Sequence, residues 1–269
     1  MNIFNYGSAA LLGAVEGITE FLPISSTGHL ILLVDFLSFR GPPGRVFEVV
    51  IQLGAILGVC WVYKERLLRL VSDPLSSSSR HLFLLLGFGF LPAAAIGLIG
   101  HDFIKSTLFS PWVVSVALVA GGIAIIALER ILPDGEINSL DELPAFKAIQ
   151  VGFFQALAMV PGTSRSAATI MGGRILGLSR GTAAEYSFLL AIPTMVAASG
   201  YDLVKNASQI DLNGAGLLVT GFLVALVTAT ATVRWLVGFV SSHNFSSFGW
   251  YRIILGSFMI AVLYFHPSA

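Results

Sequence analysis

Two carboxylates stand four residues apart in an otherwise apolar stretch near the amino terminus. Glu16 and Glu20 therefore share one face of a helix, where like charges repel each other. In an apolar segment each charge is costly unless a cation compensates it. Because Mg²⁺ and Ca²⁺ prefer oxygen ligands, the pair predicts a divalent cation, bound by the protein or brought by a substrate. The alternative is that both carboxylates lie at a helix end and reach water.

A run of hydroxyl groups follows this pair. Ser25, Ser26 and Thr27 precede His29, and such a run at a helix start is commonly a cap. His29 follows Ser26 by three residues, however, so in a helical turn the imidazole and the hydroxyl lie on one side. The spacing therefore predicts a nucleophile with a base beside it.

A second polar motif places one arginine among hydroxyl groups between apolar stretches. Free amide groups at a helix start bind anions, and the planar guanidinium of Arg165 matches the geometry of phosphate. The alternative for Arg165 is a structural ion pair with Glu16 or Glu20. Gln155, before the motif, either lines the cavity or only satisfies the hairpin. The expected substrate-binding residues are Glu16, Ser25, Thr27, Gln155, Thr163, Ser164, Ser166 and Thr169.

The composition places these groups inside a membrane. Of 269 residues, 55% are hydrophobic and only 11% are charged. A soluble domain carries about 25% charged residues, so an ordinary cytosolic enzyme and a disordered chain are excluded. Fifteen basic residues balance fifteen acidic ones, which excludes a nucleic-acid binder. The sequence predicts an all-α polytopic membrane protein.

Six segments have the length and apolar character of spanning helices. Two further stretches, about 6–38 and 146–178, are broken by proline and hydroxyl residues at Pro23 and Pro161. We expect both to be re-entrant helical hairpins, because irregular backbone at membrane depth must be surrounded by protein or water. The alternative is a pair of kinked spans in each stretch. The six expected spans are about 46–63, 82–100, 112–129, 184–204, 215–240 and 250–266.

The two broken stretches are related by a repeat. Pro23 and Pro161 are 138 residues apart, and Glu48 and Glu185 are 137 apart. These offsets indicate an internal duplication within one membrane domain, 1–269, with repeats of about 1–135 and 145–269. Three spans in each half make the topology inverted, so the hairpins enter from opposite faces and their tips meet near the bilayer midplane.

Basic residues orient the protein. Lys64, Arg66, Arg69 and Arg80 crowd one loop, which should be cytoplasmic. The spans then put ten basic residues on that side, including Arg252, against Arg40, Arg45, Lys105 and Lys205 on the other. We expect Lys64-Glu65-Arg66 and Asp141-Glu142 to be solvated loop faces.

Both polar motifs resemble the signatures of a known family, the undecaprenyl-diphosphate phosphatases or bacitracin-resistance proteins. The first is Glu16-Gly-Ile-Thr-Glu-Phe-Leu-Pro-Ile-Ser-Ser-Thr-Gly-His29, and the second is Pro161-Gly-Thr-Ser-Arg-Ser166. Similarity continues through 47–54, 185–193 and Tyr251-Arg252, so it covers essentially the whole chain. One departure is Ala167, where the family usually has glycine.

The resemblance implies a hydrolase of the bacterial cytoplasmic (inner) membrane, with its active site opening to the outer face. It would convert undecaprenyl diphosphate to undecaprenyl phosphate and phosphate, recycling the lipid carrier of peptidoglycan and other cell-wall polymers, and would confer bacitracin resistance. It also implies a divalent cation, Mg²⁺ or Ca²⁺. The expected partners are the polyprenyl diphosphate and membrane lipid; no nucleic acid is expected, and a homodimer is left open.

Carried onto this sequence, the family pattern makes Ser26, His29, Glu20 and Arg165 the catalytic residues. Glu16 and Glu20 would hold the metal. The nucleophile stays open among Ser26, His29 and water. A lipid-phosphate flippase using the same site is the alternative function, because inverted repeats are also a transporter architecture. A structural membrane subunit would leave the buried charges without a role.

Overall fold

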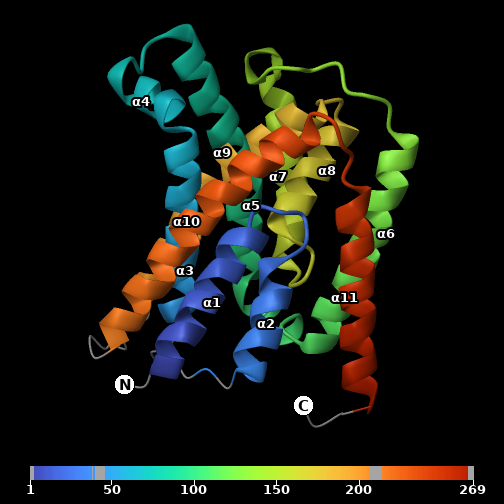
Figure 1. Cartoon of the computed structure of the whole chain (residues 1–269). Helices are drawn as coiled ribbons and strands as arrows, with labels where there is room; N and C mark the ends of the chain where they lie inside the picture. Colours follow the sequence, from blue (N-terminus) through green and yellow to red (C-terminus); the bar gives the residue numbers. More distant parts are fainter. Residues whose placement is uncertain (1–2, 38, 40–45, 206–213, 266–269) are drawn as a thin grey trace.

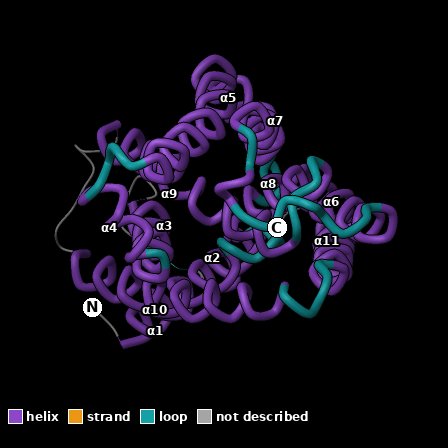
Figure 2. The backbone as a smooth tube through the Cα atoms, turned by 90° about the horizontal axis from the view of Figure 1, so that it is seen from above, coloured by secondary structure: helices purple, strands orange, loops and turns teal. Residues whose placement is uncertain are grey.

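The computed structural model describes residues 3–37, 39, 46–205 and 214–265 of the chain. Arg40 and Arg45, two of the basic residues used for orientation, lie outside these ranges. The described backbone is almost entirely helical and holds no β-strand, only one isolated bridge between Ile137 and Leu178 (Figure 2). The all-α prediction is confirmed.

Eleven α-helices and two short 3₁₀ helices make up the described chain. In order they are α1 (Ile3–Thr19), α2 (Ser26–Phe36), α3 (Val46–Val62), α4 (Lys64–Ser72), α5 (Ser77–Thr107), α6 (Pro111–Ile131), η2 (Leu140–Glu142), α7 (Ala145–Ala156), η3 (Leu157–Met159), α8 (Arg165–Ile175), α9 (Arg180–Lys205), α10 (Ala215–Val240) and α11 (Ser246–Phe265).

Five described helices are long and apolar enough to cross a membrane. They are α5, α6, α9, α10 and α11, and a sixth span is added if α3 and α4 count together. The chain bends by 79° between α3 and α4, so α4 runs across the direction of α3. Each of the six predicted spans corresponds to one of these helices. The protein is a multi-pass membrane protein.

Two pairs of short helices form the hairpins. α1 with α2 and α7 with α8 each turn back at a short break, at residues 20–25 and 160–164. Figure 1 shows the α1–α2 hairpin rising from the end of the bundle near both termini and the α7–α8 hairpin descending from the opposite end. The tips touch midway: Ser166 Oγ donates to the Leu22 carbonyl at 2.7 Å.

The first helix of each hairpin packs against a long helix of the other half. α1 lies along α10 and α7 lies along α5 (Figure 2). At Gly13 a Cβ atom would collide with the Gly221 carbonyl, and at Gly152 it would collide with that of Gly89. Close approach of helix backbones in membranes needs such small residues. The reciprocal contacts support the predicted duplication, which stays a prediction.

Candidate active site

Three side chains from the two hairpin tips form the centre of the candidate site. Glu20 Oε2 accepts a hydrogen bond of 2.6 Å from Ser26 Oγ, and Glu20 Oε1 lies 3.2 Å from Nη2 of Arg165. Glu20 is 8% exposed, so this carboxylate is buried against a hydroxyl and a cation. Glu20 and Arg165, which are 145 residues apart in the sequence, thus join the two hairpin tips through one carboxylate.

Arg165 is fixed from several directions. Its Nη1 donates to the carbonyl of Ser187 at 2.9 Å, and its guanidinium lies 5.5 Å from the ring centre of Phe21. Its Nε is buried and has no hydrogen-bond partner among the described residues. The ion pair with Glu20, one of the two alternatives for Arg165, is therefore present, and one donor of the guanidinium is still unused.

The second carboxylate, Glu16, lies one helical turn before Glu20 and is 2% exposed. Within the described residues no group of three or more Asp, Glu, His or Cys side chains is placed to hold a metal ion. The carboxylate oxygens of Glu16 and Glu20 are the kind of ligand that Mg²⁺ and Ca²⁺ prefer, although Arg165 Nη2 already lies 3.2 Å from Glu20 Oε1. The two carboxylates fit a cation by their chemistry only where a substrate supplies its remaining ligands, and the cation stays a prediction.

His29 is placed differently from the expectation. Its Nδ1 lies 2.7 Å from the Ser25 carbonyl and its Nε2 lies 2.6 Å from the hydroxyl of Tyr251 on α11. A carbonyl only accepts, so Nδ1 carries the proton and Nε2 accepts from Tyr251. The side chain hydrogen-bonded to Ser26 is thus Glu20, and His29 is held by Tyr251, a residue that periodicity could not connect to it.

Several predicted phosphate-binding side chains are occupied by contacts within the protein. Ser164 Oγ caps α8 by accepting from the amide of Ala167, and Ser166 Oγ reaches Leu22. Thr169 Oγ1 bonds Ser187 Oγ at 2.6 Å, and Gln155 bonds Gly89 and Thr194. The Gln155 side chain thus bonds α5 and α9, and within the described part of the chain it makes no hydrogen bond to its own hairpin. Thr27 is exposed, and Ser25 is buried.

The two hairpins turn with the same unusual backbone. Ser25 and Ser164, each directly before the second helix of its hairpin, have φ values of 71° and 72°. Non-glycine residues rarely adopt positive φ, and where they do so the surrounding structure must enforce it. The shared geometry places Ser26 and Arg165 at the same position, the first residue of α2 and of α8.

Arg252 is a buried cation that the distribution of charges had placed at the membrane face. It is fully buried, and it donates to the carbonyls of Pro23 in one tip and of Gly162 and Thr163 in the other. It also donates to the carbonyls of Ala117 and Leu118 in α6. In the sequence, Arg252 lies near the start of α11, where basic residues commonly face water at the membrane surface. Only its tertiary contacts show that it holds the two tips together.

The sequence matches the bacitracin resistance protein BacA family over residues 9–258. The chain belongs to this family. It is 47% identical to the undecaprenyl-diphosphatase of Parvibaculum lavamentivorans, with both chains covered completely. It is 49% identical to undecaprenyl-diphosphatase 2 of Paramagnetospirillum magneticum over 95% of this chain and 98% of that one. The undecaprenyl-diphosphatase of Aromatoleum aromaticum is also 49% identical, over 94% and 93%.

Membership in the family agrees with the two signatures recognised in the sequence. Both signatures lie inside the matched residues, and both form hairpin tips. The region of similarity also contains Tyr251 and Arg252, which bring α11 to the tips. The whole polar centre of the bundle therefore lies within the family match.

Proposed function

We propose that this protein hydrolyses undecaprenyl diphosphate to undecaprenyl phosphate and inorganic phosphate, so that the lipid carrier is used again in cell-wall synthesis. The observation that carries the proposal is the shared carboxylate of Glu20, which joins the Ser26 hydroxyl to the Arg165 guanidinium inside an apolar bundle. A phosphoryl group in transfer spreads negative charge over its oxygens, and a buried cation stabilises that charge.

Ser26 is the nucleophile that this geometry favours. Its hydroxyl donates to Glu20, which orients the oxygen and is placed to take the proton when Oγ attacks the terminal phosphorus. The bond from phosphorus to the bridging oxygen breaks and undecaprenyl phosphate leaves. The leaving group has a second pKa of about 6, so it departs without an acid. Water then hydrolyses the phosphoserine, and Ser26 Oγ leaves with the proton that Glu20 took. His29 takes the proton of this water when the water replaces the Tyr251 hydroxyl as the group that donates to Nε2.

Arg165 binds the oxygens of the terminal phosphate in this proposal. Its guanidinium is already oriented by Ser187 and Glu20, and its unpartnered Nε is a donor left for an anion. An oriented planar fork loses little freedom when it binds phosphate. Glu16 and Glu20 would hold Mg²⁺ or Ca²⁺, and the cation would supply positive charge that offsets the diphosphate.

The exposed face of α2 favours an orientation. Only Gly28 is buried among the residues of α2, and this helix exposes Thr27, Ile31 and Phe36. In Figure 1, α2 lies in the half of the bundle opposite α4. Because the basic α4 end is the cytoplasmic one by the distribution of Lys and Arg, the site opens to the outer face of the bacterial cytoplasmic membrane.

The test is phosphate release from a long-chain prenyl diphosphate by the purified protein with Mg²⁺. Wild type should release inorganic phosphate, and Arg165→Ala should be slower by about a thousandfold. Arg130→Ala, which removes an exposed arginine at the end of α6, is the matched control and should retain the wild-type rate. Full activity of Arg165→Ala would exclude the proposed site.

The flippase alternative is separated by the same experiment, because a flippase leaves its substrate intact. The Ser26–Glu20 pair favours hydrolysis, since transport needs no nucleophile. The homodimer stays a prediction, to be tested by the mass of the purified protein in detergent.

A further inference from the structure

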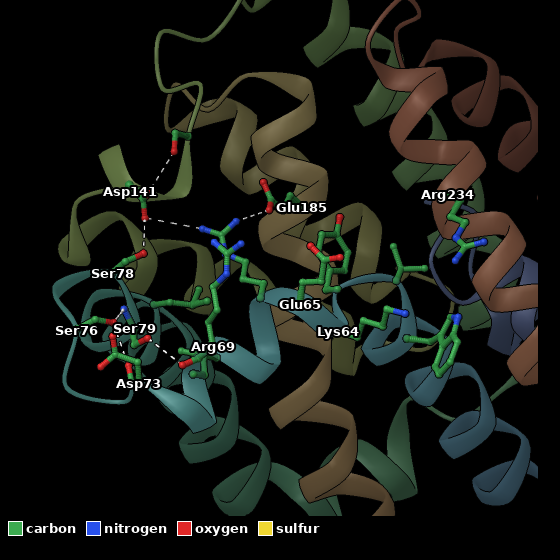
Figure 3. Close-up of a pocket in the computed structure, with 17 residues that line it drawn as sticks. Lys64, Glu65, Arg69, Asp73, Ser76, Ser78, Ser79, Asp141, Glu185 and Arg234 are labelled. Carbon is green, nitrogen blue, oxygen red and sulfur yellow. Dashed lines mark hydrogen bonds and ion pairs between the residues drawn. The ribbon is translucent and has the colours of Figure 1, made fainter.

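A polar cleft opens at the α4 end of the bundle, away from the hairpin tips. It has a volume of about 720 Å³, and residues of α3, α4, α5, α9 and α10 line it, together with the segment around η2. Figure 3 shows its charged side chains. The segment Lys64-Glu65-Arg66, expected to be a solvated loop face, begins α4 and forms one wall of the cleft, where Lys64 and Glu65 are exposed.

One end of the cleft is occupied by ion pairs. Arg66 pairs with Glu185 and lies 3.9 Å from Asp141, and Ser78 donates to the same Asp141 carboxylate. These contacts fix α4 to α9 and to η2. One guanidinium faces two carboxylates here, so this end of the cleft offers an anion no excess of positive charge.

The other end holds two cations without a carboxylate partner. Lys64 of α4 and Arg234 of α10 lie on the same side of the cleft in Figure 3, and neither makes an ion pair with a described residue. The Lys64 ammonium lies 4.7 Å from the ring centre of Trp61, which is 57% exposed. Two cations from different helices thus line the same side of the cleft, one of them against an exposed indole, and Glu65 lies between them and the paired end.

The position of this corner is that of a membrane surface. α3 ends at Val62 and α4 runs off at 79°, so the cleft lies where the bundle leaves the apolar layer. α4 and the turn after it expose Leu68, Val71 and Leu75 at 64%, 80% and 80%. A short helix with exposed apolar residues and basic neighbours lies in the interface, and Trp is enriched there.

We propose that the corner formed by Lys64, Arg234 and Trp61 binds the phosphate of an anionic phospholipid headgroup. Two unpaired cations supply the charge that a phosphate diester needs, and Trp61 lies level with the glycerol region of the lipid. Glu65 opposes binding of the anion, so it tunes the affinity. This site is separate from the hairpin tips, because none of the tip residues lines the cleft.

The experiment is native mass spectrometry of the full-length protein in detergent with added phosphatidylglycerol or phosphatidylcholine. Wild type should retain phosphatidylglycerol in preference to phosphatidylcholine, whose ammonium group cancels the phosphate charge. Lys64→Gln and Arg234→Gln should each weaken retention about fivefold. Glu65→Gln should strengthen it. Arg130→Gln removes an exposed cation outside the cleft and should leave retention unchanged.

Two further measurements distinguish the alternatives. Millimolar inorganic phosphate should not displace the lipid, whereas displacement would overturn the lipid headgroup as the ligand and indicate a free anion. Equal retention by wild type, Lys64→Gln and Arg234→Gln, or an equal loss in Arg130→Gln, would overturn the site. Phosphate release from the prenyl diphosphate should persist in every variant, which shows that each is folded.

Discussion

The hydroxyl of Ser26 donates a hydrogen bond of 2.6 Å to Oε2 of Glu20, six residues earlier in the chain. Because the other oxygen of this carboxylate faces Arg165, one side chain links the Ser26 hydroxyl of the first tip to the cation of the second. A serine hydroxyl is a weak nucleophile until a base accepts its proton. In the proposed mechanism, Glu20 is therefore the group that accepts the proton of Ser26.

The first prediction concerns a covalent intermediate. Wild-type protein quenched during turnover should carry a phosphate on Ser26, detected by mass spectrometry of the digested chain. Ser26→Ala should lose the adduct and about a thousandfold or more in rate. Thr27→Ala, which changes the exposed neighbouring hydroxyl, should keep the adduct. Turnover that persists in Ser26→Ala at the wild-type rate would assign the attack to His29 or water.

The second prediction concerns the divalent cation. A chelator should abolish phosphate release, and added Mg²⁺ or Ca²⁺ should restore it, since a metal offsets the diphosphate charge. Glu16→Gln removes one buried carboxylate and should raise the Mg²⁺ concentration for half-maximal rate about tenfold. Glu65→Gln removes an exposed carboxylate in the cleft at the α4 end and should leave this Mg²⁺ concentration unchanged. Activity that is insensitive to the chelator would contradict the metal assignment.

The third prediction concerns the bond from Tyr251 to His29. Tyr251→Phe removes the hydroxyl that lies 2.6 Å from Nε2 and should lower kcat about tenfold, because the imidazole loses its orientation. Tyr264→Phe is the same change on the same helix, at an exposed position, and should be neutral. In a variant that already carries His29→Ala, Tyr251→Phe should lower kcat no further if the tyrosine acts through the histidine. Additive losses would show an independent role.

The fourth prediction concerns stability. Arg252→Met leaves the carbonyls of both tips and of α6 without their donor and should lower the free energy of unfolding by about 3 kcal/mol. Thermal unfolding in detergent measures the loss, and Arg130→Met serves as the exposed control. A wild-type unfolding temperature for Arg252→Met would show that the tips hold together without the clamp.

The fifth prediction concerns the reciprocal helix contacts. Gly13→Ala and Gly152→Ala each place a methyl group against a carbonyl of the facing helix, so each should cost about 1–3 kcal/mol of stability. Gly7→Ala on α1 meets no atom within 4 Å and should be tolerated. Similar losses at Gly13 and Gly152 would support the duplication. Tolerance of alanine at either position would argue against equivalent packing.

Much of the fold follows from local sequence pattern. Apolar runs of spanning length predict α5, α6 and α9 to α11, because a bilayer forces every backbone group into a helix. Pro23 and Pro161 predict the two breaks, since proline removes a helical hydrogen bond. Local sequence pattern does not predict the bend after α3, because this bend depends on how α4 packs against the bundle.

The candidate site is likewise divided between what the sequence predicts and what tertiary packing decides. By itself the sequence determined the candidate groups, because charges such as Glu16, Glu20 and Arg165 are costly in apolar stretches and are rarely kept there without a function. The tertiary structure alone decided their partners: Glu20 for Ser26, Tyr251 for His29, and Arg252 for both tips. These contacts join residues from separate elements, and their geometry arises only when the hairpins and α11 pack together, so no local spacing encodes it.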